Sequence, residues 1–563
     1  MIDENKEQLE DFLNEQKKEA EKRAAKKRAK KLGFDYIDLV STKAPTEIEA
    51  MKQVDKEKAK EALMVPIQIQ GDKLIVATYN PEKKKTQKVL NELKKDFDLK
   101  VTIASLSGLK HTWSFYDYVK KEEEEITGEV NINAKRVNRI KESVDSLNDL
   151  TEKIENFESP KVSQILEVII AGAMSLGASD IHLEPEDQNG TLRLRIDGIM
   201  HVITEKLKPK ILNSLISRIK LLSGLKLNVE DEPQDGRFTM DMPEKDVEIR
   251  SSTVPSEYGE GAVLRLLDPE SIQVGLENLG FREDSIKEVR KQIQKPNGLI
   301  LNTGPTGSGK TTTLYSFLRE LNDPEVKIIT IEDPIEYHVE GISQTQVDRS
   351  SGYTFAKGLR SIVRQDPDII LVGEIRDEET AGIALNASLT GHMVFSTLHT
   401  NDAVGAIPRM LDLGAEPNIL APGATFVIAQ RLLRVLCPEC KEKTKLDKET
   451  KNKIDRFLDN LPQKINKEKF KNKKVFKAKG CEKCNNIGYE GRTGIFELFE
   501  ITKEIEEMIY EDPTELELKE KAKEEGMVEM QEDGILKVLK GETTFEEVSR
   551  LTGEIEWLPK SIQ

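Results

Sequence analysis

One stretch of the chain has the residue types and spacing to bind a nucleoside triphosphate. It fits the pattern G-x-x-x-x-G-K-[ST] at every fixed position. The residues that would surround the phosphates are Gly304, Pro305, Thr306, Gly307, Ser308, Gly309, Lys310, Thr311 and Thr312. The glycines let backbone N–H groups turn inward around a polyphosphate, Lys310 reaches the outer phosphates, and the Thr311 hydroxyl can hold Mg²⁺. The stretch therefore predicts a site for a nucleoside triphosphate and magnesium.

The residues on either side supply the elements that such a loop requires. The apolar run 299–301 is typical of a buried strand, and residues 312–321 have helical spacing, with Leu314, Phe317 and Leu318 on one face. A glycine-rich loop that fits by chance is the alternative interpretation. The strand before it and the helix after it favour a phosphate-binding loop, because the helix N-terminus adds its partial positive charge.

Two later strands end in acidic residues that could face the phosphates. Residues 328–331 lead into Glu332 and Glu336, and residues 369–372 lead into Glu374. In open α/β sheets, ligands lie at the carboxyl ends of the strands. Phosphoryl transfer to water needs a magnesium ligand and a group that orients the water. Glu374 stands where a Walker B acid belongs, although a glycine replaces the usual aspartate before it, and we expect it to be the second magnesium ligand.

Two histidines flank a third run that is typical of a strand. His392 precedes residues 393–397, and His399 follows them. A structural hydrogen bond would explain either histidine taken alone. Because the run follows two strands with acidic ends, we expect at least one of the two histidines to sense the γ-phosphate.

The four cysteines form two C-x-x-C pairs, Cys437 with Cys440 and Cys481 with Cys484. Each pair can offer two thiolates to one tetrahedral zinc ion, at Zn–S distances of about 2.3 Å. The interval 441–480 is rich in Lys, Asn and Asp, so the ion would clamp the base of a polar excursion. The alternatives are four unliganded thiols, or a redox pair, which would need a thioredoxin-like setting that the sequence lacks. With four ligand positions filled, the zinc would be structural.

Composition limits the class of protein. The 563 residues allow several domains, and 101 acidic against 85 basic residues give a net charge of −16. That balance argues against a protein that coats nucleic acid, although local basic patches remain possible. The basic run 22–31 could touch anionic lipid, but a solvated helix is the favoured interpretation. The N-terminus has no signal peptide and the most apolar stretch, 165–178, is too short to span a bilayer, so we expect a cytosolic protein.

The composition and hydrophobic pattern of the chain change at several points, and these changes predict seven regions. They are a charged N-terminal helix (1–31), a small α/β domain (32–119), a polar helical linker (120–157), a second α/β domain (158–274), the phosphate-loop domain (275–436), the cysteine segment (437–485) and a helical C-terminal region (486–563). Runs at 65–69 and 73–77 predict a hairpin around Gly71. Ser159-Pro160 predicts a helix start, and residues 544–547 predict a capping box.

The chemical motifs, taken in order, resemble those of a known family. They match the Walker A, Asp box, atypical Walker B and His box of the type II secretion and type IV pilus ATPases, and further motifs match upstream of the phosphate loop. The matching segments are 304–311, 331–337, 364–374 and 390–401, with 179–185, 195–198 and 233–237 upstream. The resemblance covers residues 160–553 well and the first 120 residues only loosely.

This resemblance implies an α/β protein whose parts have named relatives. Residues 275–436 would form a RecA-like P-loop ATPase domain, preceded by a PAS-like domain at 158–274 and by a small N-terminal domain of the secretion-ATPase type. It implies a hexameric motor that binds ATP between the PAS-like and RecA-like domains. In the family, the residue at Glu336 is the general base, and Glu374 acts through Mg²⁺ or the water network. Assembly and secretion ATPases carry the tetracysteine zinc site, whereas pilus-retraction ATPases lack it.

The domain before the phosphate loop is rich in arginine. A predicted strand at 191–198 places two arginines on one face. The candidates are Arg193, Arg195, Arg218, Arg237, Arg250 and Arg265. We expect Arg195 and Arg218, and after them Arg237, to act as arginine fingers on the γ-phosphate, from the same chain or a neighbour. An ordinary ion pair, such as Arg237 with Asp235, is the alternative for any one of them.

The function that the resemblance implies is an ATP-driven motor for assembly of a type IV pilus-like filament. It would work at the cytoplasmic face of the inner membrane, bound through a membrane platform protein and acting indirectly on pilin subunits. The close alternative is the ATPase of a type II secretion system. A nucleic-acid translocating ring is disfavoured by the acidic charge, and an inactive scaffold by the intact chemical positions. Some relatives bind cyclic di-GMP in the N-terminal region, but no clear motif for it precedes Phe34.

Overall fold

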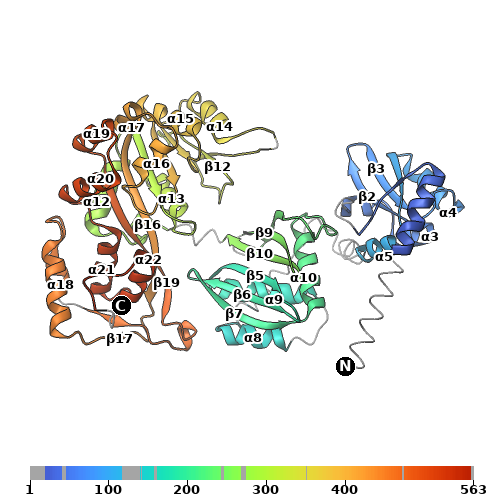
Figure 1. Cartoon of the computed structure of the whole chain (residues 1–563), viewed down its shortest axis with the longest axis horizontal. Helices are drawn as coiled ribbons and strands as arrows, with labels where there is room; N and C mark the ends of the chain where they lie inside the picture. The colour runs from blue at the N-terminus through green and yellow to red at the C-terminus, as the bar shows by residue number, and fades with distance from the viewer. Residues whose placement is uncertain are drawn as a thin grey trace. The chain divides into compact units, whose positions relative to one another are not determined.

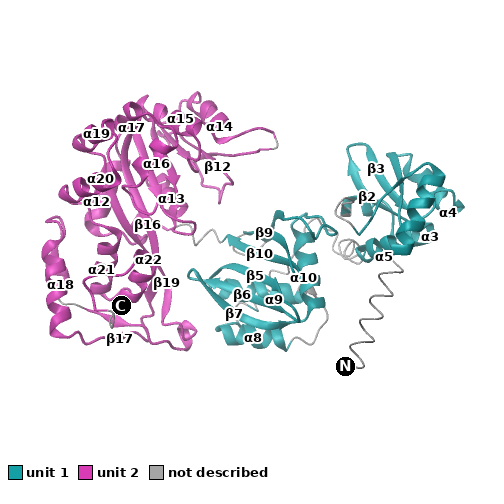
Figure 2. Ribbon diagram, viewed as in Figure 1, with its two compact units in different colours: residues 1–267 teal, residues 268–563 magenta. Residues whose placement is uncertain are grey.

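The computed structural model describes residues 19–40, 46–116, 140, 143–156, 162–241, 246–267, 274–349, 351–471 and 474–559 (Figure 1). The chain divides into two compact units, residues 1–267 and 268–563 (Figure 2). None of the helices in the described ranges is long and apolar enough to span a bilayer. The predicted helix start at Ser159-Pro160 lies outside the described residues.

The first sheet of unit 1 has four strands in the order β1-β4-β3-β2. Their bounds are β1 Asp35–Tyr36, β2 Met64–Gln70, β3 Lys73–Thr78 and β4 Asp98–Ile103, and the helices around them are α2 Ile48–Met51, α3 Lys56–Ala62, α4 Lys84–Leu93 and α5 Leu106–Ser114. β2 and β3 pair antiparallel, which confirms the predicted hairpin. Gly71 adopts a φ of +60° in the turn, a conformation that glycine reaches without steric cost.

The second sheet of unit 1 has six antiparallel strands in the order β7-β6-β5-β10-β9-β8. The bounds are β5 Ala178–Pro185, β6 Gly190–Ile196, β7 Ile199–Leu207, β8 Gln234–Asp241, β9 Asp246–Ser256 and β10 Gly259–Leu267, with helices α8 Leu147–Glu155, α9 Val162–Ser175 and α10 Pro209–Leu222. In β6, Leu192 and Leu194 are buried in the core that α9 and α10 share with the sheet. Because side chains alternate along a strand, Arg193 and Arg195 occupy the other face, as predicted.

Unit 2 is built on a seven-stranded sheet in the order β13-β12-β14-β15-β11-β16-β19. The strands are β11 Gly298–Thr303, β12 Ile328–Glu332, β13 Ser343–Gln346, β14 Ile369–Val372, β15 Met393–Leu398, β16 Ala424–Leu436 and β19 Tyr489–Glu500. All neighbours pair parallel except β16 and β19, which run antiparallel. The predicted strands at 299–301, 328–331, 369–372 and 393–397 are therefore confirmed.

Both faces of this sheet are buried. Leu299 and Leu301 of β11 belong to one apolar core, and Ile300 between them belongs to another. Burial on both faces explains why the strands read as continuous apolar runs. The helices of unit 2 are α12 Glu283–Ile293, α13 Lys310–Leu321, α14 Phe355–Val363, α15 Glu378–Leu389, α16 Ala406–Asp412, α17 Pro417–Gly423, α18 Lys448–Asn460, α19 Lys503–Tyr510, α20 Glu515–Glu524, α21 Met530–Lys540 and α22 Phe545–Thr552.

The predicted capping box at the start of α22 is only half formed. Thr544 caps the helix, because its hydroxyl accepts a hydrogen bond from the Glu547 backbone N–H at 3.1 Å. The Glu547 carboxylate does not return to the cap. It accepts bonds from the Arg434 backbone N–H at 3.0 Å and from the Arg434 guanidinium at 2.7 Å. The Glu547 carboxylate therefore bonds a charged residue on β16 instead of the cap residue of its own helix, and this pair links α22 to the sheet.

Candidate active site

The phosphate loop lies between β11 and α13, as the sequence predicts. Gly304 and Gly309 adopt φ values of +150° and +90°, in the region that favours glycine. The loop is also tightly packed: a Cβ on Gly304 would lie 2.6 Å from the Gln430 carbonyl oxygen, and one on Gly309 would lie 2.7 Å from Gln430 Nε2. Gly309 immediately precedes α13, so the helix N-terminus faces the loop. This is the arrangement that binds phosphate groups.

Gln430 supports the loop and was not identified from the sequence. It is buried in β16, and its side-chain oxygen accepts hydrogen bonds from Thr313 Oγ1 at 2.8 Å and from Asn302 Nδ2 at 3.2 Å. These bonds connect three elements, since Asn302 lies on β11 and Thr313 on α13. The available signal was indirect: a polar residue in the middle of a buried, apolar strand.

Lys310 and Ser308 show that the loop suits a polyphosphate. Lys310 Nζ donates to the carbonyl oxygens of Gly304 at 2.8 Å and Pro305 at 3.2 Å. Burial lowers the pKa of Lys310 to about 8, an effect that Glu374 opposes. The Ser308 hydroxyl is buried and has no hydrogen-bond partner among the described residues. A buried hydroxyl without a partner is costly, and a phosphate oxygen would satisfy it.

Glu374 and His399 lie together at the carboxyl edge of the sheet, on the side of Lys310. Glu374 follows β14, and its carboxylate lies 2.6 Å from Arg376 Nε and 3.7 Å from His399 Nε2. Burial lowers the pKa of His399, and the Lys310 cation lowers it further. Glu374 attracts Lys310 electrostatically. The structure therefore brings Glu374, His399 and the loop lysine together beside the phosphate loop.

His392 lies at the opposite end of the same sheet. Strand pairing places Met393 beside Gly298, at the start of β11, and Leu398 beside Thr303, where the phosphate loop begins. At about 3.3 Å per residue, His392 and His399 are about 23 Å apart. His392 Nδ1 makes a 2.9 Å hydrogen bond with the Ala387 carbonyl oxygen. The structure does not bring His392 to the phosphate loop of its own chain, so a role of His392 in sensing the γ-phosphate stays a prediction.

The two glutamates of the Asp box have different surroundings. Glu332 is 4% exposed and accepts hydrogen bonds from Tyr315, Thr330 and Gln344. Burial raises the pKa of Glu332, and the nearby charge of Glu336 raises it further. Glu336 lies in the loop after β12 and is partly exposed. Of the two carboxylates, Glu336 is the one that solvent can reach.

Arg431 is a second residue that the sequence analysis missed. Its guanidinium donates to the carbonyl oxygens of Asn401 at 3.0 Å and Gln430 at 3.2 Å. It also lies close enough to Lys310 to lower the pKa of that lysine. Together with Arg376, it gives unit 2 two arginines near the loop. The two positions are far apart in the sequence, and no local motif connects them.

The three predicted arginine fingers belong to unit 1. Arg195 Nε lies 3.5 Å from the Asp180 carboxylate, and Arg237 Nη1 lies 3.6 Å from Glu248 rather than pairing with the neighbouring aspartate. Arg218 lies on α10 and is partly exposed. The Arg195 and Arg237 side chains are 37% and 63% exposed, so both remain accessible despite their partners. Their part in hydrolysis stays a prediction.

The four cysteines form one compact cluster. Their Sγ atoms lie within 4.8 Å of one another, with separations of 4.0 Å for Cys437–Cys481 and 3.7 Å for both Cys440–Cys484 and Cys481–Cys484. A tetrahedron with Zn–S bonds of 2.3 Å has S···S distances of about 3.8 Å. The short strands β17 (Glu442–Lys443) and β18 (Phe476–Lys477) pair beside it and close the polar excursion. The cluster fits a structural zinc ion.

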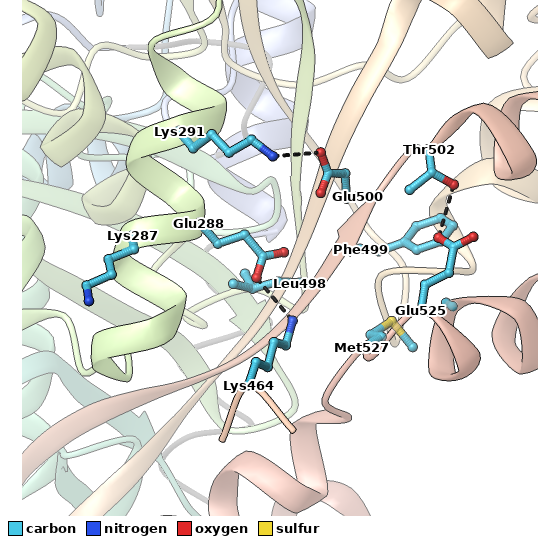
Figure 3. A pocket seen from close by; sticks show the side chains of 11 residues that line it. Lys287, Glu288, Lys291, Lys464, Leu498, Phe499, Glu500, Thr502, Glu525 and Met527 are labelled. Atoms are coloured by element: carbon cyan, nitrogen blue, oxygen red, sulfur yellow. Dashed lines mark hydrogen bonds and ion pairs between the residues drawn. The ribbon is translucent and has the colours of Figure 1, made fainter. Parts of the chain in front are cut away.

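A separate pocket of about 360 Å³ lies among α12, β19 and the segment before α21 (Figure 3). Its charges are largely matched from within: Lys291 lies 3.7 Å from Glu500, and Lys464 lies 3.1 Å from Glu288. Its lining includes no residue of the phosphate loop. Because these lysines already have carboxylate partners, the pocket offers less to a polyphosphate than the glycine-rich loop does.

A glycine-rich loop between a buried strand and a helix, beside the acidic ends of parallel strands, defines a P-loop ATPase. The chain belongs to the type II/IV secretion system protein family, whose profile matches residues 155–550. Type II secretion system protein E of Pseudomonas aeruginosa is 44% identical over 410 residues, 73% of this chain and 79% of that relative. The type IV pilus assembly ATPase PilB of Myxococcus xanthus is 36% identical over 509 residues, 89% of this chain and 86% of that relative. The X-ray structure of the Legionella pneumophila ATPase DotB shares the fold, with a TM-score of 0.50 and 20% identity over 69% of this chain and 95% of its own.

Proposed function

We propose that the protein is a hexameric motor ATPase that drives assembly of type IV pilus-like filaments at the cytoplasmic side of the inner membrane. The observation that carries this proposal is the extent of the match to the pilus assembly ATPase, which spans 89% of the chain. A match over 89% of 563 residues includes much of the region before residue 155. The match to secretion protein E spans 73%, about the length of the family profile.

The chemistry of hydrolysis follows from the side chains around the loop. Lys310 exchanges the carbonyl oxygens of Gly304 and Pro305 for the outer phosphates of ATP. Thr311 and Glu374 would hold Mg²⁺, which would supply positive charge beside the phosphates. Glu336 accepts a proton from the attacking water. Gly304, Gly307 and Gly309, with the residues between them, enclose the phosphates through their backbone N–H groups.

Further groups complete the site around the γ-phosphate. His399 contacts the γ-phosphate from the end of β15. Arg195 and Arg218, and after them Arg237, act as arginine fingers from the preceding domain of the same chain or of a neighbour. In related phosphoryl transfers such fingers are worth about 10³–10⁵ in rate. Movement of that domain on binding and release of ATP would convert hydrolysis into mechanical work.

The remaining assignments concern the metal and the partners. Cys437, Cys440, Cys481 and Cys484 hold one structural zinc ion. The motor binds an inner-membrane platform protein, acts on pilin subunits only indirectly, and is held at the membrane through its partners. We propose no stable nucleic-acid partner, because the net charge of −16 opposes one.

Deletion of the gene in its host, with complementation by the intact chain or by Lys310→Ala, tests this function. We expect loss of surface filaments, recovery with the intact chain, and no recovery with the variant. Normal filaments together with loss of secreted enzymes would overturn the proposal in favour of the type II secretion ATPase, which the secretion relatives at higher identity support. ATP turnover stimulated by single-stranded nucleic acid would instead favour a translocating ring.

A further inference from the structure

A buried polar network connects the phosphate-loop helix with the Asp box. Tyr315 of α13 is fully buried, and its hydroxyl donates a hydrogen bond to the Glu332 carboxylate. The other oxygen of Glu332 accepts bonds from Thr330 Oγ1 at 2.5 Å and from Gln344 Nε2 at 3.3 Å. Both carboxylate oxygens are therefore bonded inside the domain. Such a network is stable only when its members are satisfied, so its geometry is specific.

The same network holds the backbone of the loop that carries Glu336. Gln344 Nε2 also donates to the Tyr337 carbonyl oxygen at 3.1 Å, and Gln344 Oε1 accepts from the Val339 backbone N–H at 2.8 Å. Gln344 Nε2 also donates to the Tyr315 hydroxyl at 3.3 Å, so one amide contacts both the tyrosine and the loop backbone. The Tyr315 and Tyr337 rings lie 4.6 Å apart. Gln344 thus fastens the loop just after Glu336, and just before it the Ile335 backbone N–H donates to Gln346 Oε1 at 3.4 Å.

The placement of Tyr315 makes this connection relevant to hydrolysis. α13 begins at Lys310, whose ammonium group is expected on the phosphates, and Tyr315 lies on the same helix little more than one turn later. Tyr315 therefore connects the helix that begins at the phosphates with the loop that carries the general base. A purely structural interpretation would explain the burial, but not why the bonds converge on the backbone at Tyr337 and Val339, directly after Glu336.

We propose that Tyr315 and Glu332 are positioning residues that hold Glu336 at a fixed place relative to the bound phosphates. This inference rests on the proposed function, in which Glu336 is the general base. Glu332 then contacts neither water nor phosphate during turnover. A misplacement of about 1 Å in a reacting group can cost about 10²-fold in rate, so small shifts of the loop matter.

The first test is Tyr315→Phe in the full-length protein, which removes one hydroxyl and keeps the ring. We expect kcat for ATP to fall about 10- to 100-fold, with KM changed by less than about threefold, because the phosphate contacts remain. The matched control is Tyr353→Phe. The Tyr353 hydroxyl bonds Thr345 at 3.2 Å in the same unit and is not part of this network, so we expect kcat to be unchanged.

A double-mutant cycle with Glu336→Gln separates positioning from loss of stability. If Tyr315 acts through Glu336, Tyr315→Phe lowers kcat in the intact background and has no further effect in the Glu336→Gln background. Equal fold-losses in both backgrounds would overturn the inference. Gln344→Met provides a second route should Tyr315→Phe not fold, and it should show the same non-additivity with a smaller loss.

Two outcomes distinguish this inference from the function beneath it. Near-normal turnover of Glu336→Gln would overturn the assignment of the base and the positioning role with it. If Glu336→Gln is inactive while Tyr315→Phe turns over normally, the base stands and only the positioning role is overturned.

Discussion

The phosphate loop and the tetracysteine cluster are both compact sites of unit 2. The polar groups of the loop point outward, toward a ligand, whereas the thiols of the cluster point inward, toward one another. Around the loop, the Ser308 hydroxyl has no partner within the described structure, and Lys310 bonds only backbone carbonyl oxygens. In the cluster, the four Sγ atoms face one another and all lie within 4.8 Å of one another. The first site is open to a ligand that arrives and leaves. The second has the geometry to close around a single metal ion that would stay bound, which is the difference between chemistry and a folding constraint.

Lys310→Ala should give the largest effect, because it removes the loop's charge without disturbing the core. We expect ATP turnover to fall to background, by more than about 10³-fold, while the melting temperature stays within a few degrees. A phosphate-release assay and a thermal melt on the same preparation measure both quantities. A large drop in melting temperature would show that Lys310 has a structural role and would weaken the contrast between the two sites.

Glu336→Gln should come second, with ATP binding kept and hydrolysis slowed by about 10²-fold or more. Its matched control is Glu340→Gln, an exposed residue of the same loop, which should leave turnover unchanged. Fluorescent nucleotide titration measures binding, and single-turnover kinetics measures hydrolysis. If Glu336→Gln hydrolyses ATP at a near-normal rate, the base must be sought at Glu332 or Glu374.

The two histidines sharpen the comparison within a single strand. His399→Ala should lower kcat about 10-fold, because it removes a group beside Glu374 and the γ-phosphate position. His392→Ala should change kcat by less than about threefold and act mainly on stability, since it removes the bond to Ala387. Equal losses of turnover would mean that His392 reaches a nucleotide bound elsewhere, such as one on a neighbouring chain.

Cys481→Ser should have the smallest effect on turnover and a clear effect on stability. We expect elemental analysis to give one zinc per intact chain and less in the variant, with kcat changed by less than about twofold at low temperature. Limited proteolysis should cut the variant faster within residues 441–480. Zinc-free intact protein with unchanged stability would contradict the closed-site interpretation.

The sequence predicted what depends on local order along the chain. The strand, glycine-rich loop and helix around residues 304–311 are consecutive, and each C-x-x-C pair lies within four residues, so short patterns were sufficient. His392 was grouped with His399 because they are close in sequence. The six-residue strand β15 lies between them and places them at opposite ends of the sheet along the strand direction, which residue type alone does not reveal.

Contacts across the sheet could not be predicted in this way. Gln430 bonds Thr313 across 117 residues, and Glu547 bonds Arg434 across 113. The second contact explains why the capping box formed only in part: the carboxylate found a charged partner that the local pattern does not include. Arg431 was missed for the same reason, because Asn401 and Lys310, which lie near it, are far from it in the sequence.

The antiparallel pairing of β16 and β19 has a mechanical consequence. The paired segment runs from Phe426 opposite Glu500 to Leu436 opposite Tyr489. Gln430 within it contacts the phosphate loop, while the first thiol knuckle follows β16 directly and the second ends shortly before β19 begins. The two-stranded ribbon therefore extends about 23 Å from Gln430, beside the phosphate loop, to Cys437. At this far end, a metal ion bound by both cysteine pairs would join the two strands. Loss of the metal ion would let the far ends of the two strands separate. The backbone hydrogen bonds between β16 and β19 would keep this motion from reaching the phosphate loop.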